Sequence, residues 1–248
     1  MRITVIGAGN MGGALIKGWA KAVRNGRADL DITITARTQQ TLDKFNDEFP
    51  EVHTLLNNKE AVQDADIVVL AVKPWLIDDV LAEISDSIDG KTIISVAAKA
   101  RNEHIDVYAM PNIAAEFGEG MTFIESNGSD KILESKELFE LVGKVMVVDE
   151  RSFMAGNMMA GCGIAYIMRF VRAMMEGGVE MGLYPNTAKE IALQAMQGAV
   201  TVLEETGIHP EVAIDKVTTP GGLTIRGLNE LDHAGFNSAV IRCLKAGL

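Results

Sequence analysis

The stretch that decides the fold reads Ile3-Thr4-Val5-Ile6-Gly7-Ala8-Gly9-Asn10-Met11-Gly12. Its first four residues are all β-branched and predict a strand. The glycines then follow the pattern Gly-x-Gly-x-x-Gly, and apolar residues from Met11 to Ala22 recur at helical spacing. Because a strand, this glycine pattern and a helix follow one another directly, they predict a turn that binds the phosphates of a dinucleotide.

Each glycine has its own role in such a turn. Gly7 permits the tight turn, Gly9 lets the backbone approach a pyrophosphate because it has no Cβ, and Gly12 lets the helix pack close to the strand. Asn10 and Met11 stand at the start of the helix, where free N–H groups and the positive end of the helix dipole favour an anion. The alternative interpretation is a glycine turn with no ligand.

The end of the second predicted strand bears on the choice of cofactor. A site for NAD places Asp or Glu there to hold the ribose 2′-hydroxyl. This strand instead ends Thr35-Ala36-Arg37-Thr38-Gln39. Arg37 offers a fork of donors to a 2′-phosphate and Thr38 offers a hydroxyl, so we predict NADPH, with NADH as the alternative. An arginine that is only solvated would also fit this position.

Strands and helices alternate through the first 150 residues. The predicted strands are Ile3–Ile6, Asp31–Ala36, Asp66–Val72, Thr92–Ala98, Val107–Met110, Met121–Glu125 and Lys144–Val148, and the predicted helices include Thr38–Phe49, a helix from Pro74 to about Ile84 and Ser129–Val142. Strands that are apolar throughout are typical of a parallel sheet covered on both faces. The pattern therefore predicts a doubly wound α/β domain over residues 1–150.

Residues 151–248 contain no convincing strand and predict an all-helical domain. Met154–Leu183 shows helical spacing, Thr187-Ala188-Lys189-Glu190 resembles a capping box that opens a helix to about Thr206, and Gly221-Gly222 and Gly235 separate two shorter helices. Most of the 13 methionines lie here, at positions 154, 158, 159, 168, 174, 175, 181 and 196. Helices this apolar must be buried, so we expect them to pack against a second subunit. An ordinary methionine-rich core and an open surface for peptides are the alternatives.

Composition excludes several classes of function. With 23 Lys+Arg against 34 Asp+Glu, the net charge of −11 argues against binding to nucleic acid or to anionic lipid. Two lone cysteines suit a reducing compartment, and the four histidines show no metal spacing. No uninterrupted apolar run reaches the roughly 18 residues of a membrane span, and no signal peptide is evident. We therefore expect a cytoplasmic protein without a metal site.

Other strand ends should face the nicotinamide side of the cofactor. These are Ala71-Val72-Lys73-Pro74 and Ala97-Ala98, because ligands of open α/β sheets lie outside the carboxyl ends of the strands. Lys73 would line the cofactor channel, although a plain loop lysine is the alternative.

Taken together, the motifs resemble those of the pyrroline-5-carboxylate reductase family. The matching stretches are Ile6–Gly12, Ala71-Val72-Lys73-Pro74, Met110-Pro111-Asn112, Gly118-Glu119-Gly120-Met121-Thr122, Gly178–Leu183 and Thr219-Pro220-Gly221-Gly222-Leu223-Thr224-Ile225. The first is shared by many nucleotide-binding reductases, whereas the last is quite specific.

The resemblance implies a Rossmann-like domain, a helical dimerisation domain and NAD(P)H-dependent reduction of a cyclic imine to L-proline. It implies that the Pro-Gly-Gly loop with Thr219, Gly221 and Gly222 holds the substrate carboxylate. It also implies that Thr224 hydrogen-bonds the ring nitrogen, that Asn112 lies near the nicotinamide, and that the partner subunit contributes to the site.

The residues themselves agree with such chemistry. Gly221-Gly222, next to threonines and before a predicted helix Leu223–Leu231, would expose backbone N–H groups to a carboxylate. Hydride transfer to a protonated imine needs orientation more than a strong acid–base pair, and no such pair is evident here. A simple turn between helices is the alternative for Gly221-Gly222.

The chain departs from the family pattern at several positions. Ala160, Cys162 and Ile164 stand where the family has two serines and a proline, Ile113 replaces a threonine, and Lys99 replaces a glycine. Cys162 is either a small buried residue or a reactive thiol. These losses of polar groups concern turnover and the identity of the imine more than the fold.

Three other functions stay open at this point. The chain could reduce a different cyclic imine, or bind NADP(H) without turnover as a sensor or partner protein. A hydroxyacid dehydrogenase would need a catalytic lysine, and neither Lys189 nor Lys216 lies in a supporting pattern.

Overall fold

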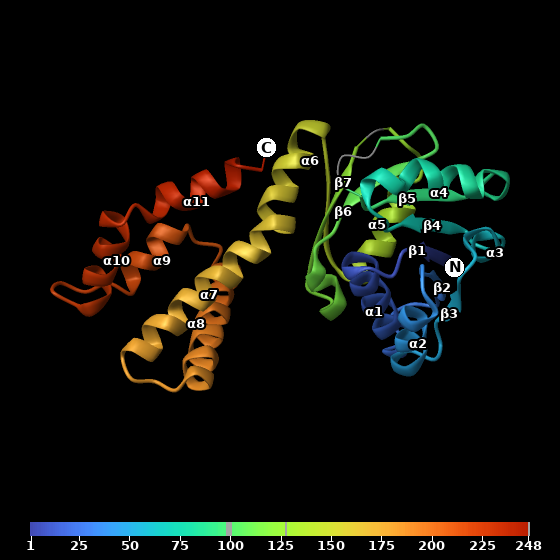
Figure 1. Cartoon of the computed structure of the whole chain (residues 1–248). Coiled ribbons are helices and arrows are strands. Elements are labelled where there is room, and N and C mark those ends of the chain that lie inside the picture. Colours follow the sequence, from blue (N-terminus) through green and yellow to red (C-terminus); the bar gives the residue numbers. More distant parts are fainter. Residues whose placement is uncertain (98–100, 127, 248) are drawn as a thin grey trace. The chain divides into compact units, whose positions relative to one another are not determined.

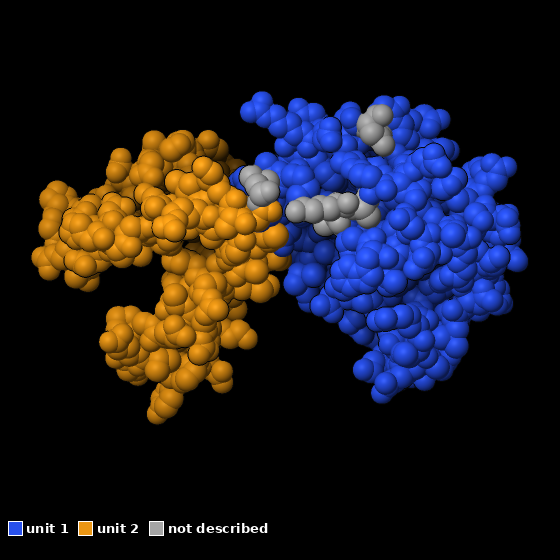
Figure 2. All heavy atoms as spheres, turned by 45° about the horizontal axis from the view of Figure 1, so that its top comes forward, with its two compact units in different colours: residues 1–161 blue, residues 162–248 orange. Residues whose placement is uncertain are grey.

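The computed structural model describes residues 1–97, 101–126 and 128–247. They divide into two compact units, Met1–Gly161 and Cys162–Leu248, which Figure 2 colours separately. The division falls later in the chain than the expected domain boundary after residue 150. The first unit therefore carries the whole sheet together with the helix that follows it.

One eight-stranded sheet forms the centre of the first unit (Figure 1). Its strands, in spatial order, are β3 (His53–Leu55), β2 (Asp31–Thr35), β1 (Arg2–Ile6), β4 (Ile67–Leu70), β5 (Thr92–Ser95), β6 (Val107–Met110), β7 (Gly120–Glu125) and β8 (Gly143–Val148). All neighbours are parallel except β6 and β7. The chain builds outward from β1 in both directions, so the doubly wound fold class is confirmed.

Helices cover both faces of this sheet. One face packs against α1 (Asn10–Arg24), α2 (Gln39–Glu48) and α5 (Ile132–Glu140), and the other against α3 (Asn58–Val62), α4 (Ile77–Ile84) and α6 (Glu150–Asn157). Along β4, Ile67 and Val69 belong to the first core, whereas Val68 and Leu70 belong to the second. Because alternate residues point to opposite covered faces, every residue of such a strand is apolar.

Two short elements were not predicted, and one predicted strand ends early. β3 has three residues and α3 has five, which is too few for a hydrophobic period to show. β5 ends at Ser95, so the predicted strand Thr92–Ala98 was wrong at Val96 and Ala97, whereas Ala98 lies outside the described residues, as does Lys99 after it.

The described residues of the second unit form helices and connecting turns with no strand, as predicted. Its helices are α7 (Gly163–Glu180), α8 (Pro185–Thr206), α9 (Pro210–Lys216), α10 (Leu223–His233) and α11 (Phe236–Lys245). The predicted capping box was wrong, because α8 begins earlier, at Pro185 with Tyr184 as its N-cap. Proline is favoured at the first helical position, where its missing N–H costs nothing, so Thr187 lies inside the first turn.

Little of the second unit is buried by its own chain. No residue of α9, α10 or α11 is buried, and α7 and α8 each bury two small residues. Large apolar side chains of α7 and α8 are exposed, among them Ile167, Met168, Ile191 and Leu193. An exposed apolar surface of this kind marks a site where another protein binds, which agrees with the expected second subunit.

One stretch passes a membrane-span test by length and composition. Glu150–Glu180 forms 31 helical residues whose most apolar window has a mean hydropathy of 1.2 and is 11% buried. Asn157 and Arg169 interrupt this stretch, so it contains no uninterrupted apolar run of membrane-spanning length. An apolar helix that packs in an oligomer passes the same test, so the finding is weak evidence for a membrane location.

The two tryptophans offer a matched test of the core. Trp19 is fully buried, its Nε1–H donates to the Leu138 carbonyl at 2.9 Å, and its ring packs on Phe139. Trp19→Phe should lower the free energy of unfolding by about 2–4 kcal/mol, because it leaves a buried carbonyl unpaired and a void. Urea denaturation followed by circular dichroism measures this. Trp75, 74% exposed, is the control, and an equal loss in Trp75→Phe would contradict the packing described.

Candidate active site

Close packing fixes the glycine turn between β1 and α1. Gly7 has a φ of +109°, and a Cβ added there would lie 2.8 Å from the carbonyl oxygen of Ala71. A Cβ on Gly12 would collide with the carbonyl oxygen of Gly7 and come within 3.0 Å of the Ala71 Cβ. β1, the turn, α1 and the end of β4 therefore pack closely together. Only glycine at Gly7 and Gly12 permits this close packing.

Gly9 differs from its neighbours in this turn. It has an ordinary φ of −77°, and no atom lies within 4 Å of the position that its Cβ would take. It is the N-cap of α1 and makes no side-chain cap, so side chains leave the first N–H groups of the helix open. Packing therefore does not require glycine at position 9. The open space over Gly9, with Asn10 exposed beside it, is suited to an anion.

The second predicted contact region follows β2. The Gly7 N–H donates to the Thr35 carbonyl at 3.1 Å, which joins this strand end to the glycine turn. Thr38 is the N-cap of α2, and its Oγ1 lies 2.9 Å from the Thr41 Oγ1. Arg37 is exposed, and among the described residues it enters no ion pair. A free guanidinium beside a helix N-terminus is suited to a phosphate group.

Asn58 is a polar residue of this region that the sequence analysis missed. Its Oδ1 accepts from the Thr35 Oγ1 at 2.7 Å, and its Nδ2 donates to Glu83 at 2.8 Å. The sequence feature that could have indicated this residue is the pair Asn57-Asn58, which stands at the start of a helix too short to be predicted. Asn58 therefore braces the end of β2 from the side of α3 and α4.

The stretch Ala71-Val72-Lys73-Pro74 lies beside the glycine turn, as expected. The Ala71 N–H donates to the Ile6 carbonyl at 2.9 Å, and the Val72 side chain lies against Gly7. Lys73 is exposed and caps the short 3₁₀ turn Pro74–Leu76. The structure thus brings together the predicted residues that follow β1, β2 and β4.

Asn112 lies at the end of β6 and is almost completely buried. Its Oδ1 accepts from the Ala114 N–H at 3.2 Å and caps the 3₁₀ turn Ile113–Phe117. Its Nδ2 donates to the Ala160 carbonyl at 3.2 Å. Both polar atoms of the side chain are therefore bonded to the protein's own backbone.

A groove runs over the outer side of α1 next to the glycine turn. This cavity of about 420 Å³ is lined by small residues of α1 and by Lys17, Phe45, Ile113 and Glu116. Lys17 Nζ lies 3.0 Å from Glu48 and 3.4 Å from Glu116. The hydrogen bond to Glu48 in particular raises the pKa of Lys17, so this lysine stays charged beside the turn.

The substrate residues predicted in the second unit form one compact turn. The Gly222 N–H donates to the Thr219 carbonyl at 2.9 Å, and Gly221 has a φ of +71°, as a type II turn with Pro220 requires. Gly222 is then the N-cap of α10 and provides no side-chain cap. Thr219, Gly221 and Thr224 are exposed, so an uncapped helix N-terminus and the Thr224 hydroxyl are accessible together.

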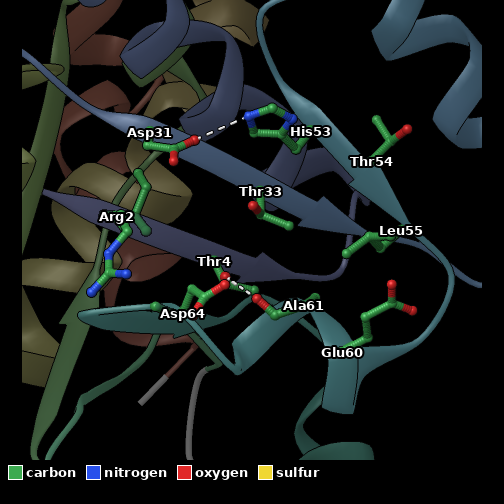
Figure 3. Close-up of a pocket in the computed structure, with 12 residues that line it drawn as sticks. Arg2, Thr4, Asp31, Thr33, His53, Thr54, Leu55, Glu60, Ala61 and Asp64 are labelled. Atoms are coloured by element: carbon green, nitrogen blue, oxygen red, sulfur yellow. Dashed lines mark hydrogen bonds and ion pairs between the residues drawn. The ribbon is translucent and has the colours of Figure 1, made fainter.

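A second cavity lies away from all predicted site residues. It measures about 340 Å³ and is lined by the first residues of β1, β2 and β3 and by α3 (Figure 3). In it His53 faces Asp31 at 3.2 Å, and the Thr4 hydroxyl donates to the Ala61 carbonyl (Figure 3). Because ligands of open α/β sheets lie at the carboxyl ends of the strands, we do not assign it to the cofactor.

Comparison with known proteins identifies the family. Residues 150–248 match the family described as pyrroline-5-carboxylate reductase dimerisation, and residues 2–99 match NADP oxidoreductase coenzyme F420-dependent. Pyrroline-5-carboxylate reductase of Synechocystis is 36% identical over 79% of this chain and 78% of its own length. The enzyme of Corynebacterium melassecola is 31% identical over 98% of this chain and 95% of its own. The chain belongs to the pyrroline-5-carboxylate reductase family.

Further relatives agree with this membership. Pyrroline-5-carboxylate reductase 1 of Dictyostelium discoideum is 36% identical over 97% of this chain, which spans only 47% of that protein. The solved reductase of Coxiella burnetii has a TM-score of 0.83 at 30% identity and covers 99% of this chain and 95% of its own. The Plasmodium falciparum reductase, solved with NADP bound, has a TM-score of 0.86 over 100% of this chain and 95% of its own, and at 23% identity it supports the fold alone.

The contrast between Gly9 and Gly12 is testable. Gly12→Ala should lower the free energy of unfolding by about 2 kcal/mol or more, because its Cβ overpacks the turn. Gly9→Ala should unfold like the wild type, since its Cβ meets no atom, yet bind NADPH at least about tenfold more weakly, because one lost phosphate contact has that magnitude. Urea titration and isothermal calorimetry measure the two effects. Equal stability of the two variants would refute the packing argument.

Proposed function

We propose that the protein reduces 1-pyrroline-5-carboxylate to L-proline with NADPH as the reductant. The observation that carries this proposal is the turn Thr219–Gly222 at the open N-terminus of α10, in a chain that also has the dinucleotide-type turn after β1. The first feature is suited to a small carboxylate and the second to a pyrophosphate.

The residues of the first unit fit a dinucleotide. Gly7, Gly9, Asn10, Met11 and Gly12 would hold the pyrophosphate at the start of α1, where no atom lies within 4 Å of the position that a Cβ on Gly9 would take. Arg37 and Thr38 would hold the 2′-phosphate at the start of α2. The stretch from Ala71 to Pro74 would border the nicotinamide side. When bound, NADPH supplies the hydride that reduces the C=N bond.

The second unit would hold and orient the imine. Because Gly222 is an N-cap without a side-chain cap, the backbone N–H groups in the first turn of α10 are open and would bind the carboxylate without a lysine or arginine. The Thr224 hydroxyl, on that same first turn, would hydrogen-bond the ring nitrogen and fix the face of the C=N bond. An imine nitrogen is readily protonated, so the protein needs to position the iminium rather than to supply a strong acid.

We further propose that the enzyme works as a homodimer or larger homo-oligomer through its C-terminal helices. The exposed apolar residues of α7 and α8 support this. Neither Cys162 nor Cys243 forms a disulfide within the residues that the structure describes, which suits the cytoplasm.

Oxidation of NADPH on addition of synthetic 1-pyrroline-5-carboxylate tests the proposal directly. Thr224→Ala should lower kcat/KM by about one to two decades, the effect of one hydrogen bond to a charged group, with NADPH affinity nearly intact. Thr224→Ser keeps the hydroxyl and should recover most of the rate. Absorbance at the reduced-nicotinamide band follows the reaction.

Two outcomes would contradict the proposal. Binding of NADPH without imine-dependent oxidation would favour a sensor or partner protein. Turnover of other cyclic imines with none of 1-pyrroline-5-carboxylate would favour a different substrate.

Cofactor choice is tested at Arg37. Arg37→Gln should reduce the preference for NADPH over NADH, as the ratio of kcat/KM values, by about tenfold or more, because a charge-assisted contact to the 2′-phosphate is lost. Lys44→Gln makes the same charge change at an exposed position of α2 and should leave the ratio unchanged. A wild-type preference for NADH would overturn the assignment.

A further inference from the structure

Both ends of the Asn112 side chain are bonded to the protein's own backbone. An asparagine side chain offers one oxygen acceptor and one NH₂ donor group. Here the oxygen accepts from the Ala114 N–H and the nitrogen donates to the Ala160 carbonyl, both at 3.2 Å, and only 7% of the residue is exposed. Buried side chains that are bonded on both ends hold backbone segments in place.

The segment held by the Nδ2 of Asn112 is unusual. Ala160 lies in the π-helical turn Met158–Cys162 that joins α6 to α7. A π turn is rare, and it often accompanies functional sites. At Gly161, within this turn, a Cβ would meet only the end of the Asn157 side chain, which can move aside. The turn continues directly into α7, so it is not a frayed helix end.

The hydrogen bond ties this turn to the edge of the sheet that carries the predicted cofactor residues. β1, β4, β5 and β6 are parallel, so their carboxyl ends share one edge. Asn112 follows β6 at that edge, as the glycine turn follows β1. The Ala160 carbonyl is therefore fixed to the same edge as the turn that would bind the pyrophosphate.

We propose that Asn112 is a positioning residue: it places the backbone of the Met158–Cys162 turn at the carboxyl edge of the sheet and affects hydride transfer through that turn, without contacting the cofactor. This rests on the proposed function. The bond uses the carbonyl of residue 160, not its side chain. The alanine at this position, where the family has a serine, therefore leaves the bond intact.

Asn112→Asp tests the two hydrogen bonds of this side chain separately, because it keeps the bond with the Ala114 N–H and removes the bond with the Ala160 carbonyl. The Asp keeps an oxygen that accepts from the Ala114 N–H, but it turns a second oxygen toward the Ala160 carbonyl, where repulsion replaces attraction. In the cofactor-free enzyme, hydrogen–deuterium exchange of residues 157–163 should become about tenfold faster, the effect of one lost hydrogen bond, while residues 113–118 stay protected. With substrate and NADPH, kcat should fall about tenfold and the KM for NADPH should change by less than about threefold.

A matched control and a second variant complete the test. Asn57→Asp changes another N-cap asparagine, whose Oδ1 accepts from the Glu60 N–H at 3.2 Å, and should leave exchange at 157–163 unchanged. Asn112→Ser keeps a capping oxygen that cannot reach Ala160, and it replaces the Asp variant if that chain fails to fold.

Each outcome decides the proposal. Unchanged exchange at 157–163 in the Asn112 variants would show that the side chain does not hold the turn. Faster exchange with unchanged kcat would show that the turn has no part in the reaction. A rise in the KM for NADPH with unchanged exchange would indicate direct cofactor contact. If the wild type oxidises no NADPH, the proposed function fails, whereas the exchange measurement still tests the contact.

Discussion

The absence of room for a Cβ at Gly7 and Gly12 is the constraint on which the candidate site depends. Where β1 turns into α1, the helix start packs against the Gly7 carbonyl, and the turn packs against the end of β4. This close approach sets where α1 begins, and so where its free N–H groups point. The Gly7 N–H also bonds to the end of β2. Three strand ends are thereby held at fixed distances, and the residues that follow them share one edge of the sheet.

Hydrophobic period predicts the fold well wherever an element is long and covered on both faces. β1, β4 and β6 are such strands, and each stands within a few residues of its predicted place. The period cannot show β3 or α3, because three and five residues are too few for a repeat to be recognised. The start of α8 illustrates a different limit: Thr187 and Glu190 have the spacing of a capping box, yet Pro185 begins the helix earlier because its fixed φ suits the first turn.

The candidate site was predictable where a motif carries its own geometry. The glycine turn, Arg37 and the Thr219–Gly222 turn are local, so sequence spacing alone places them. Asn112 is different, because the bond from its side chain to Ala160 joins residues 48 positions apart. No spacing rule indicates such a contact, and the same asparagine was expected to lie near the nicotinamide. Asn58 and the charged pair of Lys17 with Glu48 depend in the same way on tertiary packing.

The sparse burial of α9, α10 and α11 makes the stability of this enzyme depend on its concentration. Helices that have no fully buried residue within their own chain gain much of their stability from association, and association obeys mass action. The turn before α10 is then only as ordered as the assembly around it. If the turn before α10 binds the imine as proposed, dilute chains would bind NADPH before they bind the imine, and activity would rise more steeply than in proportion to the protein concentration.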